Sequence, residues 1–308
     1  MFPKQLGVVF ALGLFISPLL AQAVEVVPIG QTIKPEQGSG PEPSGNAPHK
    51  AKKKAAPAAT TLKAGHSFMV ESAEIVSSGL TKQGETVHFR EAEEVGSGNR
   101  PVIFSGALAS GQVTTSEKGK NGGKIVVKID SIESVSGEKI PISGQVNVDG
   151  DKSQAAYAVG ERFTATLDEK ASVKGKFKKE EIPTFEKNAF AEIRGQGVKA
   201  DIKKGQVKGK VELILETSKE VSIDDVVPES VALYRVNDHL TPKTVPAATG
   251  SKAKVGDSNK NGTADMLLTF DAWDFIKFQP RGSNMIYVKG KLKNGQDFDA
   301  NTKVTIDY

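Results

Sequence analysis

The stretch Asp257-Ser-Asn-Lys-Asn-Gly-Thr-Ala-Asp265-Met-Leu-Leu-Thr-Phe270 joins a pattern of metal ligands to the start of a β-strand. Loops that wrap Ca²⁺ place side-chain oxygens at positions 1, 3, 5 and 9 and a backbone carbonyl at position 7. Gly262, at the sixth position, permits the sharp turn that brings the later ligands back toward the ion. The stretch therefore predicts a Ca²⁺ site with five ligand residues: Asp257, Asn259, Asn261, Thr263 and Asp265.

The pattern differs from a full EF-hand loop. Position 12 is Leu268 where that loop has a bidentate Glu, and the flanking residues alternate like strands. Only Asp257 and Asp265 contribute charge, so we expect weak binding, with a dissociation constant of roughly 10⁻⁴–10⁻³ M as in extracellular modules. The alternative is a polar turn without an ion. A further oxygen is expected from one of three carboxylates: Asp271, Asp224 or Asp225.

Residues 190–308 are expected to form one β-domain around this loop. Short runs rich in β-branched residues alternate with turn signals, as in an immunoglobulin-like sandwich. Asn294-Gly295, between two of these runs, predicts a type I′ hairpin turn. The order of Val211–Leu215, Pro228–Leu233, the calcium loop and Tyr287–Leu292 is similar to a C-terminal β-sandwich module of exported proteins, which carries one EF-hand-like or dockerin-like D-x-N-x-N-G-x-x-D loop.

Residues 62–177 predict another β-domain. Runs such as Val102-Ile-Phe104 and Ile125-Val-Val-Lys-Ile129 alternate with turn signals such as Lys120-Asn-Gly-Gly123. Together with Lys82-Gln-Gly-Glu-Thr-Val87 and Gly137-Glu-Lys-Ile-Pro-Ile142, these phrases resemble a β-domain of exported bacterial proteins. The resemblance implies a fold and export, but no activity. The fold class expected for the whole chain is all-β, with two sandwich-like or barrel-like domains in tandem, joined by a charged linker at residues 178–189.

The first 61 residues are typical of a targeting sequence followed by a spacer. Lys4, an apolar run from Leu6 to Leu20, and Ala21-Gln-Ala23 have the form of a signal peptide (residues 1–23) that is cleaved after Ala23. The alternative is a membrane anchor, but a run of about 15 apolar residues is shorter than the roughly 20 that span a bilayer. Residues 24–61 are rich in Pro, Ala and Lys, which predicts a disordered linker. We therefore expect a secreted, periplasmic or cell-surface protein with no transmembrane segment in its mature chain.

Composition argues against several classes of function. The chain has 41 Lys and Arg against 37 Asp and Glu, and the net charge of +4 is spread along it, so we expect no nucleic-acid partner. It has no cysteine, which excludes disulfides and thiol catalysis. It contains no G-x-S-x-G motif and no histidine pair at metal-ligand spacing, so no catalytic residue is identified.

These features predict an exported, non-enzymatic, calcium-stabilised protein that acts in adhesion or envelope organisation, with an envelope or extracellular polymer or protein as partner. The alternative is a carbohydrate-binding accessory module of a secreted hydrolase system. That alternative depends on Trp273, the only tryptophan, which would stack on sugar rings if it were exposed. Packing against the core is the other reading of Trp273, and the more common one.

Overall fold

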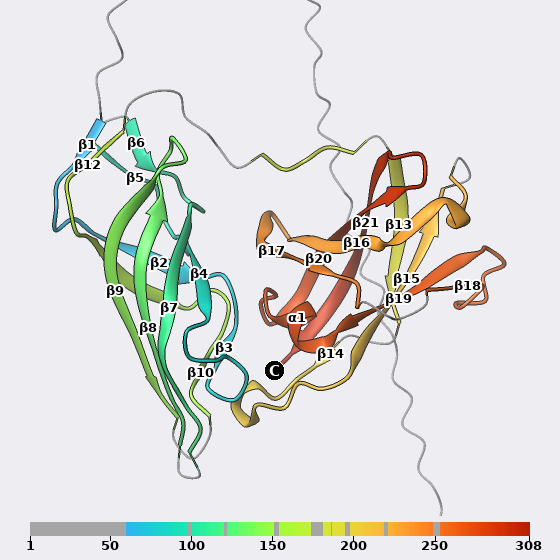
Figure 1. The fold of residues 1–308 in the computed structure, drawn as a ribbon, viewed down its shortest axis with the longest axis horizontal. Helices are drawn as coiled ribbons and strands as arrows, with labels where there is room; N and C mark the ends of the chain where they lie inside the picture. Colours follow the sequence, from blue (N-terminus) through green and yellow to red (C-terminus); the bar gives the residue numbers. More distant parts are fainter. Residues whose placement is uncertain are drawn as a thin grey trace, which may run out of the picture. The chain divides into compact units, whose positions relative to one another are not determined.

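The computed structural model describes residues 60–97, 100–119, 122–150, 154–173, 181–185, 187–194, 198–218, 221–248 and 253–308 (Figure 1). The expected signal peptide and nearly all of the expected N-terminal linker lie outside these residues. Most of the expected linker at 178–189 is described: residues 181–185 form no regular element, and residues 187–189 already belong to a strand that begins at Lys187. The described chain is almost entirely β-structure, as predicted. Its helices are all too short or too polar to cross a membrane.

Six strands of the N-terminal half close into a barrel, in the order β11-β2-β4-β7-β8-β9. Alternation along each strand places apolar side chains inside; in β8, Ile125, Val127 and Ile129 are buried while Lys124 and Lys128 are exposed. The barrel strands are β2 (Ser67–Ser72), β4 (Thr86–Glu91), β7 (Leu108–Glu117), β8 (Lys124–Glu133), β9 (Lys139–Asp149) and β11 (Arg162–Leu167).

Gly111 marks a bend in the barrel wall. The pairing of β7 with β8 shifts register between Ser110 and Gly111, and a Cβ atom added at Gly111 would lie 2.6 Å from the carbonyl oxygen of Lys128. Only glycine leaves space for so close an approach of two backbones. Three small sheets accompany the barrel: β1 (Thr60–Leu62) with β12 (Ala171–Val173), β3 (Val76–Ser77) with β10 (Ala156–Tyr157), and β5 (Val95–Ser97) with β6 (Arg100–Ile103).

The C-terminal half forms one nine-stranded mixed sheet, in the order β17-β16-β20-β21-β13-β15-β19-β18, with β14 also paired to β21. Its strands are β13 (Lys187–Ile193), β14 (Val198–Lys199), β15 (Lys210–Thr217), β16 (Val226–Val236), β17 (His239–Pro246), β18 (Lys254–Gly256), β19 (Asp265–Asp271), β20 (Gly282–Leu292) and β21 (Asp297–Asp307). Three short helices lie between strands: the 3-10 helices η1 (Ile202–Lys204) and η2 (Ile223–Asp225), and α1 (Ala272–Ile276).

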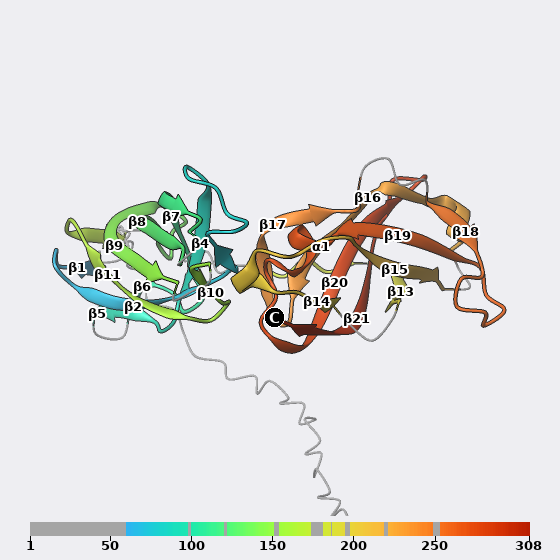
Figure 2. The same ribbon diagram turned by 90° about the horizontal axis from the view of Figure 1, so that it is seen from below.

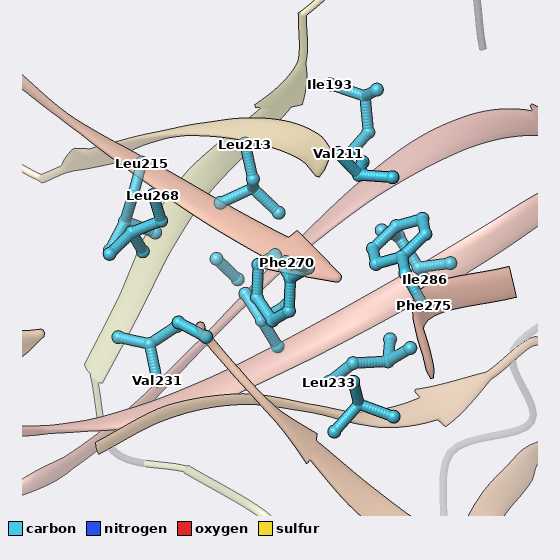
Figure 3. Packing of buried hydrophobic residues seen from close by; sticks show 14 of the residues in the cluster. Ile193, Val211, Leu213, Leu215, Val231, Leu233, Leu268, Phe270, Phe275 and Ile286 are labelled. Carbon is cyan, nitrogen blue, oxygen red and sulfur yellow. The ribbon is translucent and has the colours of Figure 1, made fainter. Parts of the chain in front are cut away.

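This connectivity differs from the separate antiparallel sheets of the immunoglobulin pattern. Strand β21 pairs antiparallel with β20 on one side and parallel with β13 and β14 on the other, so hydrogen bonds run through the whole set. The sheet wraps around one hydrophobic core, in which Phe270 and Phe275 lie 5.6 Å apart between their ring centres and pack beside Leu233 and Ile286 (Figure 3). The described residues all belong to one compact unit of the chain.

Candidate metal centre

The predicted calcium loop connects two neighbouring strands of the sheet. Strands β18 and β19 lie side by side at the edge of the sheet (Figures 1 and 2), and Gly256 pairs directly with Asp265. Four of the five predicted ligand residues therefore lie in the loop that leaves β18, and the fifth, Asp265, is the first residue of β19.

Inside the loop, Asp257 is bonded to the backbone of the turn that follows it. Its Oδ1 accepts from the backbone N–H of Asn261 at 2.9 Å, and its Oδ2 accepts from that of Gly262 at 3.1 Å. The backbone takes left-handed φ angles twice, 61° at Lys260 and 84° at Gly262. The glycine adopts this conformation without steric cost, whereas a lysine rarely does. The chain therefore curls tightly around the Asp257 carboxylate.

Asp265 is the most constrained member of the site. It is 0% exposed, and its Oδ2 accepts from the backbone N–H groups of Ser258 at 2.7 Å and Asn259 at 3.3 Å. Its Oδ1 is also buried and has no hydrogen-bond partner within the described residues. A buried carboxylate oxygen without a partner is costly, and coordination to a cation is one of the few ways to satisfy it.

Two carboxylates from the sheet also face the loop. Glu216, on β15, is the cross-strand partner of Asp265, and its Oε1 accepts from Asn259 Nδ2 at 2.6 Å and from Asn261 Nδ2 at 2.7 Å. Glu192, on β13, accepts from Asn259 Nδ2 through Oε2 at 3.4 Å. Sequence reasoning missed both residues because strand pairing, rather than spacing along the chain, brings them to the loop. The only signal in the sequence was an acidic residue beside apolar positions of a strand: Glu192 lies between Ala191 and Ile193, and Glu216 follows Leu215.

The arrangement fits a hard cation. Four carboxylates surround two amide side chains, and within the described part of the chain none of the four forms an ion pair with Lys or Arg: Asp257, Asp265, Glu192 and Glu216. Among the residues searched, no three His, Cys, Asp or Glu side chains converge closely enough to hold a metal alone. A bound Ca²⁺ would therefore also need asparagine and backbone oxygens, which suit this ion.

The other carboxylates considered as ligands have different roles. Asp271 lies at the opposite end of β19 from Asp265 and caps α1, where its Oδ1 accepts from the backbone N–H groups of Trp273 and Asp274 at 2.9 and 3.1 Å. Asp224 and Asp225 lie in η2, ahead of β16. Among the described residues, none of these three carboxylates contacts the loop.

Trp273, the candidate sugar platform, lies in α1 and is half-buried. Its side chain packs against the hydrophobic core of the sheet. Of the two interpretations of this tryptophan, the structure favours packing.

Comparison with known proteins supplies no identification: no family model matches the chain, and no curated protein or solved structure matches it significantly. The geometry of the loop is therefore the main ground for assigning a function.

Proposed function

We propose that this chain is an exported, non-enzymatic β-protein that binds one Ca²⁺ in the 257–265 loop and acts in adhesion or organisation at the cell envelope. The observation that carries the calcium assignment is Asp265, a fully buried carboxylate whose Oδ1 has no hydrogen-bond partner in the described chain. Its other oxygen already accepts from two amides of the loop, so the carboxylate faces the loop interior.

The proposed ion acts as a structural clip. It neutralises Asp257 and Asp265 and ties the loop to β19, whose apolar residues Leu268 and Phe270 belong to the core. Binding to the folded state alone stabilises it by about 1.4 kcal/mol when free calcium is tenfold above the dissociation constant. Extracellular modules with dissociation constants of roughly 10⁻⁴–10⁻³ M reach this saturation near millimolar calcium. Such a clip suits a protein that works outside the cytosol.

Thermal unfolding of the full chain, in chelator and in excess CaCl₂, tests the calcium assignment. We expect a melting temperature about 2–4 °C higher with calcium, the shift that about 1 kcal/mol produces in a domain of this size. Asp265→Asn should abolish the calcium response, because it removes the charge that faces the ion. Asp271→Asn, at the other end of the same strand, is the matched control and should keep the response. Equal melts of the unmodified chain in the two solutions would rule the site out.

The envelope role has a separate test. The labelled full chain should bind to intact cells or isolated envelopes in calcium. It should bind less in chelator, because removal of the bound Ca²⁺ loosens the sheet. Trp273→Ala should leave this binding unchanged, since Trp273 packs against the core. Retention on a glycan that disappears in Trp273→Ala would instead favour the carbohydrate-binding alternative, and no binding to cells, envelopes or glycans would contradict both roles.

A further inference from the structure

Glu216 holds both asparagine side chains of the loop. Its Oε1 accepts from Nδ2 of Asn259 at 2.6 Å and from Nδ2 of Asn261 at 2.7 Å, although the loop lies more than forty residues further along the chain. We propose that Glu216 is the positioning residue of the calcium site: it turns the amide oxygens of Asn259 and Asn261 toward the ion. This inference rests on the calcium function proposed above.

The orientation follows from which atoms can donate. An ionised carboxylate only accepts hydrogen bonds, and an amide side chain donates only through its nitrogen. Asn259 Nδ2 is within hydrogen-bond distance of Glu216 at 2.6 Å and of Glu192 at 3.4 Å, so both of its acidic neighbours require the nitrogen to face them. The Oδ1 atoms must then face the loop backbone, where they accept from the N–H groups of Asn261 at 3.3 Å and Thr263 at 2.8 Å. An amide oxygen has two lone pairs, so each retains capacity for an ion.

Glu216 also explains why the two central ligands are neutral. An aspartate at position 259 or 261 would place a carboxylate against Glu216, where it would repel and could not donate. The negative charge missing from the loop is supplied by the strand instead. Because Glu216 already pairs across the strands with Asp265, two like charges stand opposite each other, an arrangement that destabilises a sheet until a cation compensates it. The site is therefore more acidic than its loop sequence indicates, and it binds calcium more tightly than two loop carboxylates alone would.

Calcium titration by calorimetry on the chelator-treated full chain tests the assignment. Partners that orient a metal ligand typically contribute about 10- to 100-fold in affinity. We expect Glu216→Ala to weaken calcium binding about 100-fold, and Glu216→Gln only about tenfold, because the Gln oxygen still accepts from the two amides. Glu212→Ala is the matched control: Glu212 lies on the same strand and face, bonded to Arg194 at 3.1 Å, and its loss should leave the affinity unchanged.

The order of the two losses in calcium affinity distinguishes a positioning role of Glu216 from a purely electrostatic one. A role through charge alone predicts equal losses of affinity for Glu216→Ala and Glu216→Gln. Equal losses would therefore overturn the positioning role, and so would unchanged affinity in Glu216→Ala. In both cases binding by the unmodified chain would leave the calcium function intact. No binding by the unmodified chain would overturn both. Thermal unfolding in chelator checks that the variants fold. In chelator, Glu216→Gln should be at least as stable as the unmodified chain, since it removes the repulsion with Asp265.

Discussion

At the scale of single residues, Glu91 shows how the barrel perturbs a carboxyl group. The residue ends β4 and is 2% exposed; its Oε2 has no hydrogen-bond partner among the described residues, and its Oε1 accepts only a long bond, 3.4 Å, from the backbone N–H of Glu93. Burial raises the pKa of Glu91 from its ordinary 4.5 to about 8, and the nearby charges of Glu93 and Glu71 act in the same direction. Near neutral pH the folded chain therefore holds a proton that the unfolded chain releases.

This difference makes stability depend on pH. Because the folded-state pKa is the higher one, the contribution of Glu91 is complete below pH 4.5 and is lost as the pH rises to about 8. Glu91→Gln keeps the neutral form at every pH, so the loss of stability between pH 5 and pH 8, measured as urea midpoints, should become smaller. Glu93→Gln, an exposed neighbour, should retain most of the original slope. The same slope in Glu91→Gln and in the unmodified chain would contradict the assignment.

At the scale of elements, short-range patterns predicted strands well and turn geometry less well. The hairpin around Asn294-Gly295 is confirmed, since β20 and β21 pair across it from Lys291 opposite Asp297. The type I′ turn is wrong: that turn needs positive φ at both central residues, and only Gly295 has it, at 88°. The Asn294 side chain instead accepts from the backbone N–H of Gln296 at 3.0 Å. This local bond stabilises a longer turn that the dipeptide alone does not reveal.

The calcium site was likewise predictable from the sequence only in part. Its loop residues follow one another closely, so their spacing alone predicted Asp257, Asn259, Asn261, Thr263 and Asp265 as one group. Glu216 and Glu192 reach the loop only because β15 pairs with β19 and β13 with β15. Those pairings depend on how the whole sheet is ordered, with β21 between β20 and β13. Alternation along a strand does not specify its neighbours, so the half of the site supplied by the sheet was not predictable.

At the scale of the whole molecule, an ionic cluster centred on the buried residues Glu74 and Lys277 joins residues far apart in the sequence. Lys277, directly after α1, places its Nζ 2.8 Å from Glu74 Oε2 and 2.6 Å from Glu85 Oε1. Its backbone carbonyl accepts from the N–H of Ile75 at 2.7 Å. The other oxygen of Glu74 lies 2.7 Å from His88 Nδ1. Burial alone would lower the pKa of Lys277, but the Glu74 and Glu85 carboxylates outweigh it and hold that pKa above its ordinary value.

The cluster predicts a large effect of one substitution outside the calcium site. Glu74 is 1% exposed, so Lys277→Met leaves its charge buried without its ammonium partner, which should cost about 3–5 kcal/mol in the free energy of unfolding. Glu74→Gln added to Lys277→Met should recover much of the loss, because it removes the unpaired charge. Lys291→Met breaks an exposed pair with Asp297 and should change stability by no more than about 1 kcal/mol. Urea unfolding of the four proteins measures these differences. Similar losses for Lys277→Met and Lys291→Met would mean that the cluster is solvated and does not hold these distant segments together.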